Sequence, residues 1–140
     1  MNIATYVSAA SLARAPESKK YYSVALFKDT RTHENVRRDN RLLLQLLNTG
    51  HAELVEILGR QSAKDIDKIS KLEEIGEEIA WKDGFPYLSS STAVCDLHNC
   101  GWIDAGDHEL GLFEVRDWFV GSEDTKAILY TDDLKEMGIL

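Results

Sequence analysis

Most apolar residues of the chain fall into short runs that alternate with polar residues or end at turn residues, as in β-strands. Two runs near the start are rich in β-branched and aromatic residues, and the polar stretch 13–20 between them predicts a loop. The run 41–47 is apolar nearly throughout, which predicts a strand at the centre of a sheet. The predicted strands are 3–12, 21–27, 41–47, 79–81, 92–103, 108–120 and 127–131.

Three other segments carry helix signals. Thr32 is the predicted N-cap of a short helix that ends near Asn40, with Glu34 in the first turn, where the helix dipole favours an acidic residue. Residues 51–58 place their apolar side chains on one face and are closed by a glycine, which predicts an amphipathic helix. Residues 63–75 have only a thin apolar stripe, which predicts a helix on the surface.

Strands outnumber helices in this pattern, and they are short and regularly spaced. A parallel α/β sheet would need a helix after nearly every strand. We therefore expect a mainly β structure with short helices, an α+β arrangement, in which an antiparallel barrel holds two or three helices at its ends. The length of 140 residues, without repeats or linkers, predicts that residues 1–140 form a single domain.

Composition narrows the classes of function. No apolar run approaches the roughly 18 to 20 residues needed to span a bilayer, and the first 15 residues lack the basic leader of a signal peptide. Cys95 and Cys100 lie an odd number of residues apart on a predicted strand and so face opposite sides, which disfavours a disulfide. We expect a soluble, cytoplasmic protein with no membrane partner, whose cysteines are reduced and buried.

Charge is distributed unevenly along the chain. The net charge is -8, yet the segment from Arg14 to Arg41 holds eight basic and four acidic residues, a local charge of +4 that leaves -12 to the rest. An acidic body disfavours nucleic acid, because nucleic-acid binding depends on neutralising phosphates. A local basic patch suits one small anionic ligand. The alternative is a solvated surface whose charges happen to be uneven.

The basic patch includes a predicted strand-to-helix junction. Here the free N–H groups of a helix start would lie beside hydroxyls and cations, in the manner of a phosphate site. The segment lacks the glycine-rich spacing of nucleotide loops, so side chains must share in holding the anion. An ordinary capped helix with surface charges is the alternative. The candidate phosphate ligands are Lys28, Thr30, Arg31 and Thr32.

Two further groups of residues could carry chemistry. The segment 95–100 contains potential zinc ligands, but they would lie on opposite faces of a strand and no second cluster completes a site. Gly106, Asp107 and His108 precede an apolar strand. Gly106 would permit close backbone approach or a bulge, and Asp107 would accept backbone hydrogen bonds that fix where His108 points. A simple turn between two strands is the alternative for these three residues.

In their order and spacing, several segments resemble the flavin reductase-like family of FMN-binding split barrels, in particular its short stand-alone members. The resemblance covers most of the chain, and no single motif decides it. The segments are 2–8 (NIATYVS), 24–36 (VALFKDTRTHENV), 42–47, 58–60 (LGR), 67–69 (DKI) and 105–108 (AGDH).

The resemblance implies a site for FMN, or for FAD in its place. It implies that Ala4, Thr5, Tyr6 and Ser8 lie along the flavin ring, and that Lys28, Thr30, Arg31 and Thr32 hold the phosphate. His108 would be the catalytic residue, near the flavin face where the nicotinamide of NADH or NADPH stacks. It also implies a homodimer, in which the aromatic residues Trp102, Trp118 and Phe119 pack either between subunits or in the core.

Three functions remain open at this stage. The first is an FMN-dependent NAD(P)H oxidoreductase of the flavin reductase type. The second is a flavin-binding electron carrier, or a subunit that docks on a redox partner protein without catalysing reduction. The third is a split barrel that has abandoned flavin and binds another ligand. Lys28, Thr30, Arg31 and Thr32 argue against it, because a protein with no phosphate to bind would not need them.

Overall fold

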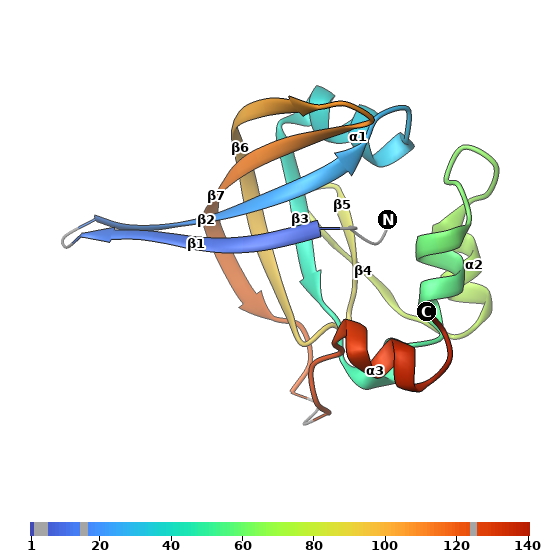
Figure 1. Cartoon of the computed structure of the whole chain (residues 1–140). Helices are drawn as coiled ribbons and strands as arrows, with labels where there is room; N and C mark the ends of the chain where they lie inside the picture. Colours follow the sequence, from blue (N-terminus) through green and yellow to red (C-terminus); the bar gives the residue numbers. More distant parts are fainter. Residues whose placement is uncertain (2–5, 15–16, 124–125) are drawn as a thin grey trace. The chain divides into compact units, whose positions relative to one another are not determined.

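The computed structural model describes residues 1, 6–14, 17–123 and 126–140. Its larger sheet has five strands in the hydrogen-bonded order β1-β2-β7-β6-β3, and its smaller sheet has two, β4 and β5 (Figure 1). The strands are β1 (Tyr6–Arg14), β2 (Glu17–Phe27), β3 (Arg41–Leu46), β4 (Ile79–Lys82), β5 (Phe85–Leu88), β6 (Ala93–Ala105) and β7 (His108–Val120). The helices are α1 (Arg31–Asp39), α2 (Lys68–Glu74) and α3 (Thr131–Glu136), with a 3₁₀ turn (Thr49–His51) and a π-helical turn (Glu56–Arg60).

The predicted fold class, mainly β with short helices, is confirmed. β2 pairs antiparallel with both β1 and β7. Among the described strands, β1 and β3 end the hydrogen-bonded order, so these ladders do not close the large sheet into a barrel. The prediction that β3 is a central strand is therefore wrong. On β3, Gln45 Oε1 accepts the backbone N–H of Leu88 at 2.8 Å and the hydroxyl of Ser91 at 3.0 Å.

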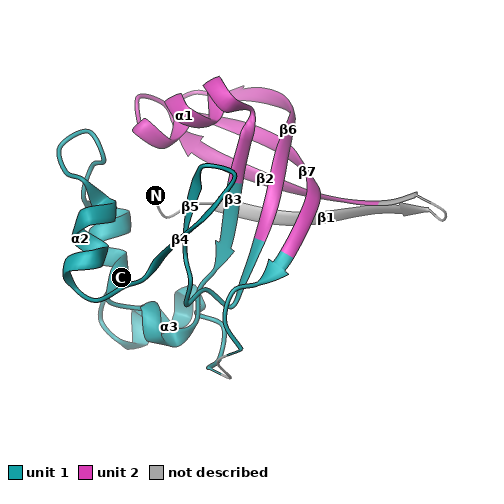
Figure 2. Ribbon diagram, turned by 180° about the vertical axis from the view of Figure 1, so that it is seen from behind, with its two compact units in different colours: residues 1–3, 43–94, 119–140 teal, residues 4–42, 95–118 magenta. Residues whose placement is uncertain are grey.

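The chain divides into two compact units (Figure 2). Unit 1 consists of residues 1–3, 43–94 and 119–140, and unit 2 consists of residues 4–42 and 95–118. The prediction of a single domain over 1–140 stays a prediction. No helix in the described part of the chain is both long and apolar enough to cross a bilayer.

The core of unit 1 forms where the helical segments pack. One buried cluster consists of Leu54, Leu58, Leu72 and Leu88, and a second consists of Ala52, Val55 and Leu134. The helix predicted over 51–58 is helical only in part, and it continues through Gly59 as the π-helical turn instead of ending there. α2 is shorter than predicted, because the carboxylate of Asp67 accepts the N–H groups of Ile69 and Ser70 and starts the helix late.

The core of unit 2 is formed by buried side chains of its strands and of α1. On β2, Val24 and Leu26 are two residues apart and both are buried. Leu97 on β6 and Phe113 on β7 are buried too. Val36 of α1 is buried as well. Burial does not alternate along β6, since residues 94–97 are all buried. The bounds predicted for β7 are confirmed.

Two predictions about local structure are wrong, and one strand was not predicted. The described part of the predicted loop 13–20 is strand, since Ala13 pairs with Ser18 and Arg14 with Glu17 in the β1–β2 ladder. Residues 127–131 form no strand, because a carboxylate of α3 caps the N–H of Tyr130 and begins a helix there. β5 contains Pro86, a residue that disfavours strands because it lacks a backbone N–H. Proline is tolerated in edge strands, and both strands of a two-stranded sheet are edge strands.

Candidate functional site

The turn between β6 and β7 lies within unit 2 and has two residues, Gly106 and Asp107. Of the two, only Gly106 has a positive φ, +80°, which is the pattern of a type II′ hairpin turn. A Cβ atom at Gly106 would meet nothing within 4 Å, so backbone conformation rather than space requires glycine. The turn between two strands is confirmed, whereas a close backbone approach at Gly106 stays a prediction.

This turn holds the end of β2 and the residues that precede α1. The backbone N–H of Lys28 donates to the carbonyl of Asp107 at 3.0 Å, and Lys28 Nζ donates to Asp104 Oδ2 at 2.7 Å. Phe27 and His108 are paired across β2 and β7, and their ring centroids lie 3.7 Å apart. The structure therefore brings the predicted catalytic histidine and the predicted phosphate segment to one end of the sheet in unit 2.

His108 is held by its neighbour Asp107. Its Nδ1 lies 2.7 Å from Asp107 Oδ1, and its side chain is 22% exposed. The hydrogen bond from His108 lowers the pKa of the Asp107 carboxyl below its ordinary value. A carboxylate at Nδ1 favours the tautomer that carries its proton there and leaves Nε2 as an acceptor. Asp107 thus orients His108 directly, whereas the predicted backbone contact is made by Asp104, whose Oδ1 accepts the N–H of Gly106 at 2.9 Å.

Thr30 is the N-cap of α1, two residues before the predicted cap Thr32. Thr30 Oγ1 accepts the N–H of His33 at 3.2 Å and donates to the carbonyl of Phe27 at 2.8 Å. Its hydroxyl is therefore committed to the helix start. Arg31 and Thr32 occupy the first turn, where backbone N–H groups have no acceptor within the helix. Glu34, predicted in the first turn, is confirmed there.

Both candidate cations make exposed ion pairs. Lys28 pairs with Asp104, and Arg31 Nη1 lies 3.4 Å from Glu34 Oε2. The bond from Lys28 lowers the pKa of the Asp104 carboxyl. Exposed ion pairs contribute little to stability, so each cation could exchange its carboxylate for a phosphate at little cost. The donors near the helix start are thus two exchangeable cations, one hydroxyl and two backbone N–H groups.

The residues predicted along the flavin ring are only partly described. Ala4 and Thr5 lie outside the described residues. Tyr6 and Ser8 lie on β1, where they pair with Ala25 and Ser23 of β2. The roles of all four residues stay predictions.

The predicted interface aromatics differ in exposure. Trp118 is 63% exposed. Trp102 is half-buried, with its ring edge-on to Phe113, and Phe119 is half-buried, with its ring edge-on to Tyr87.

The sequence analysis missed a polar group between α1 and the core-facing side of β6 and β7. His33 Nε2 lies 2.7 Å from Glu109 Oε2, and Arg37 Nε lies 3.6 Å from the same oxygen. The Arg37 guanidinium also lies over the ring of Trp102, 5.1 Å from its centroid. The available signals were weak: His33 and Arg37 are spaced to share a helix face, and Glu109 follows the histidine of the turn.

The two cysteines are free, and Cys95 is buried whereas Cys100 is exposed. The prediction of opposite faces is confirmed, and the prediction that both are buried is wrong for Cys100. Burial raises the pKa of the Cys95 thiol. In the described part of the chain, no group of three His, Cys, Asp or Glu residues could hold a metal ion.

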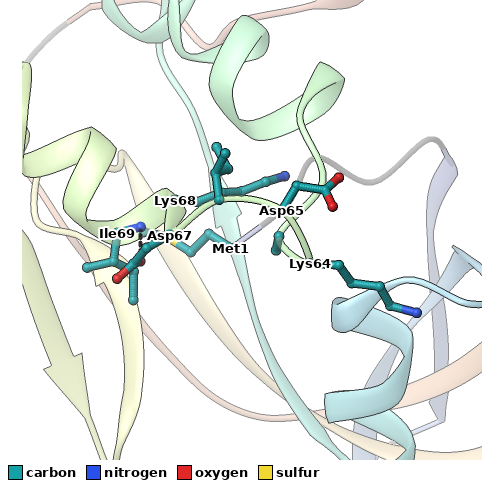
Figure 3. A pocket seen from close by; sticks show the side chains of 8 residues that line it. Met1, Lys64, Asp65, Asp67, Lys68 and Ile69 are labelled. Atoms are coloured by element: carbon teal, nitrogen blue, oxygen red, sulfur yellow. Dashed lines mark hydrogen bonds between the residues drawn. The ribbon is translucent and has the colours of Figure 1, made fainter.

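An open depression lies in unit 1, lined by Met1 and residues 63–69 (Figure 3). Of the predicted site residues that the structure describes, none lines it. Lys68 is buried at its edge, with Nζ donating to the carbonyl of Leu58 at 2.7 Å, and burial lowers the pKa of this ammonium group. This cation serves the packing of unit 1.

The family model named "Flavin reductase like domain" matches residues 2–137, nearly the whole chain. The chain belongs to this family. Solved structures support the same fold for this flavin reductase like domain. An FMN-binding protein from Thermus thermophilus superimposes with a TM-score of 0.64 at 21% identity, over 82% of this chain and 61% of that chain. A search of curated proteins gave no significant match.

Two further structures extend the comparison. The NADH:FAD oxidoreductase of Streptomyces globisporus superimposes with a TM-score of 0.67 at 16% identity, over 84% of this chain and 65% of that chain. Flavoredoxin from Methanosarcina acetivorans has a TM-score of 0.69 at 14% identity, over 93% of this chain and 72% of that chain. The flavin reductase like domain described here thus spans less than two thirds of two of these three structures. At these identities the likeness establishes the fold alone.

Proposed function

We propose that this protein binds FMN, or FAD in its place, and transfers hydride from NADH or NADPH to the flavin. The observation that carries the proposal is the joining of two segments in unit 2. The β6–β7 turn holds His108 against Phe27, directly before the donors at the start of α1. Membership of the flavin reductase like domain family supports the same reading.

The donors at the start of α1 fit a phosphate monoester. Arg31 and Lys28 would supply charge, while Thr32 would supply its hydroxyl and, with Arg31, backbone N–H groups. Thr30 would act indirectly, because its hydroxyl already caps the helix. Ala4, Thr5, Tyr6 and Ser8 would line the flavin ring. When bound, the flavin supplies the hydride-accepting chemistry.

His108 is the residue we propose to guide the hydride donor. Its imidazole is fixed by Asp107 at Nδ1 and by the ring of Phe27 on one side. A ring held in this way can position a nicotinamide without large loss of side-chain entropy on binding. Precise placement of the two reactants accounts for much of the rate that such a protein can supply.

A second function has one observation in its favour. Phe27 lies against the His108 ring, so one face of the proposed guide is covered. A covered ring has less surface for a nicotinamide. The contact therefore suits a non-catalytic electron carrier, or a subunit that binds flavin and docks on a redox partner protein. The exposed Trp118 could serve such docking or the interface of a homodimer. Light scattering of the purified protein would measure whether it is a homodimer.

The test is the visible absorption spectrum of the protein with added FMN, recorded before and after anaerobic NADH and then NADPH. We expect a perturbed flavin spectrum on binding and bleaching by one or both nucleotides. His108→Gln should bind FMN with similar affinity and bleach more slowly in stopped-flow measurements. Bound flavin that stays oxidised would favour the carrier, and an unperturbed flavin spectrum would contradict flavin binding altogether.

A further inference from the structure

The proposed phosphate segment, residues 28–32, is held at both of its ends by β6, β7 and their turn. At the first end, Lys28 is bound through its backbone N–H to Asp107 and through Nζ to Asp104. At the second end, His33 is bound to Glu109. His108 and Glu109 are consecutive on β7, so their side chains lie on opposite faces of the sheet. One strand end therefore contacts both sides of the segment.

His33 connects Glu109 to the helix start. Its backbone N–H donates to the N-cap hydroxyl of Thr30, and its imidazole N–H donates from Nε2 to Glu109 Oε2 at 2.7 Å. The side chains of His33 and Glu109 are 16% and 17% exposed, so water competes weakly for this bond. Arg37, one turn later on the same face of α1, lies 3.6 Å from the same carboxylate oxygen.

We propose that Glu109 is a positioning residue for the phosphate group of the flavin nucleotide, acting through His33. The inference rests on the proposed function, because it assigns a role within the same site. The bond between Glu109 and His33 fixes the first turn of α1 against β7. It thereby holds the N–H groups of Arg31 and Thr32 in the arrangement that receives the phosphate.

The physical reason is preorganisation. Several donors bind one anion well only if they are already arranged, since ordering them on binding reduces the affinity. Groups that orient primary ligands in metal sites change affinity by about 10- to 100-fold, although they do not touch the metal. A phosphate-specific effect distinguishes this role from general support of the fold. Support of the fold would affect every ligand alike.

The experiment compares FMN with riboflavin, which lacks the phosphate, by fluorescence titration of the full chain. Glu109→Ala should raise the Kd of FMN about tenfold, equal to about 1.4 kcal/mol, and leave the Kd of riboflavin unchanged. Glu109→Gln, whose amide oxygen can still accept the bond from His33, should restore most of the difference. Glu114→Gln is the matched control, since Glu114 lies on the same strand and pairs with Lys19 and Arg116.

A second variant tests whether His33 transmits the effect. His33→Ala should reproduce the loss of FMN preference, and adding it to Glu109→Ala should change the FMN to riboflavin ratio no further. Multiplying effects would overturn the route through His33. A ratio that Glu109→Ala leaves at the wild-type value, or equal weakening of both ligands, would overturn the inference while the proposed function stands. Failure of the wild-type protein to bind FMN would overturn both.

Discussion

Each unit of the molecule contains a histidine that links two chain segments, and the two histidines differ in what surrounds them. His51 in unit 1 is 3% exposed. Its Nδ1 accepts the backbone N–H of Asn48 at 3.1 Å, and its Nε2 lies 2.9 Å from Ser90 Oγ. The Ser90 hydroxyl donates in turn to Glu77 Oε2 at 3.0 Å. Every link in this chain of hydrogen bonds ends on another group of unit 1.

His33 in unit 2 is more accessible and lies beside donors that face no partner within their helix. Its imidazole binds Glu109, and its backbone belongs to the first turn of α1. The comparison teaches that a histidine network is not by itself a functional site. A fully buried and satisfied network fixes a loop, whereas a partly buried one next to unused helix-start N–H groups can organise a ligand.

The largest effect is expected where the structural network is broken. His51→Leu leaves the buried N–H of Asn48 without its acceptor, which costs about 1 to 3 kcal/mol. It also removes the hydrogen bond to Ser90, worth about 1 kcal/mol, although the Ser90 hydroxyl keeps Glu77 as its acceptor. We expect the free energy of unfolding to fall by about 3 kcal/mol, measured by urea denaturation. The ratio of FMN to riboflavin affinity should stay at its wild-type value in the folded fraction. If His51→Leu changed the ratio of FMN to riboflavin affinity and left the free energy of unfolding unchanged, the proposed difference between His51 and His33 would be contradicted.

A smaller effect is expected from the donors at the start of α1. Replacing Arg31 with Ala and Thr32 with Val should weaken FMN binding by about 2 kcal/mol, because hydrogen bonds to charged groups contribute roughly 1.5 to 3 kcal/mol. The free energy of unfolding should change by less than about 0.5 kcal/mol, as is usual for surface substitutions. Arg38→Ala, in the last turn of the same helix, is the control. Unchanged FMN affinity in the double variant would reject the phosphate site.

The smallest effect concerns the acid behaviour of the turn. The pKa of Asp107 is lowered chiefly by His108, and that of Asp104 chiefly by Lys28, both from an ordinary value of 3.8. In His108→Gln, we expect the Asp107 pKa to rise toward 3.8 while the Asp104 pKa stays low, as followed by NMR of the carboxyl carbons. Carboxylates with lowered pKa values stabilise the fold above their unfolded-state pKa, and this contribution is lost as the pH falls through the lowered values.

The opposite outcome of that titration would be equally informative. If the Asp107 pKa does not move in His108→Gln, the contact between the two side chains is absent in solution. His108 would then lack its anchor at Nδ1, and the proposed guiding role would lose its main structural support.

How far the sequence predicted the molecule depends on the range of the interactions involved. The alternation of side chains placed β7 correctly, since burial on one face of a strand is a local pattern. The helix start was misplaced by two residues, because Thr30 and Thr32 are equally good caps. Asp29, at φ +63°, turns the chain so that Thr30 is the cap. No local pattern signals this backbone turn.

The sequence identified several individual residues of the candidate site, but not which of them lie close together in the fold. Lys28 and His108 were both identified, yet only the register between β2 and β7, which pairs Phe27 with His108, shows that they lie at the same end of the sheet. Glu109 and His33 are 76 residues apart, and no local signal links them. Pairings of this kind depend on how strands align, which a single sequence does not reveal.

The placement of the three tryptophans gives the protein a built-in optical reporter. Trp81 and Trp118 are 59% and 63% exposed, whereas Trp102 is half-buried beside Arg37 and Phe113. A water-soluble quencher would reach the two exposed indoles first, so the emission that survives comes mainly from Trp102. This remaining tryptophan fluorescence comes from beside Arg37, the residue of α1 that lies near Glu109. It would report movements of α1 without an added label.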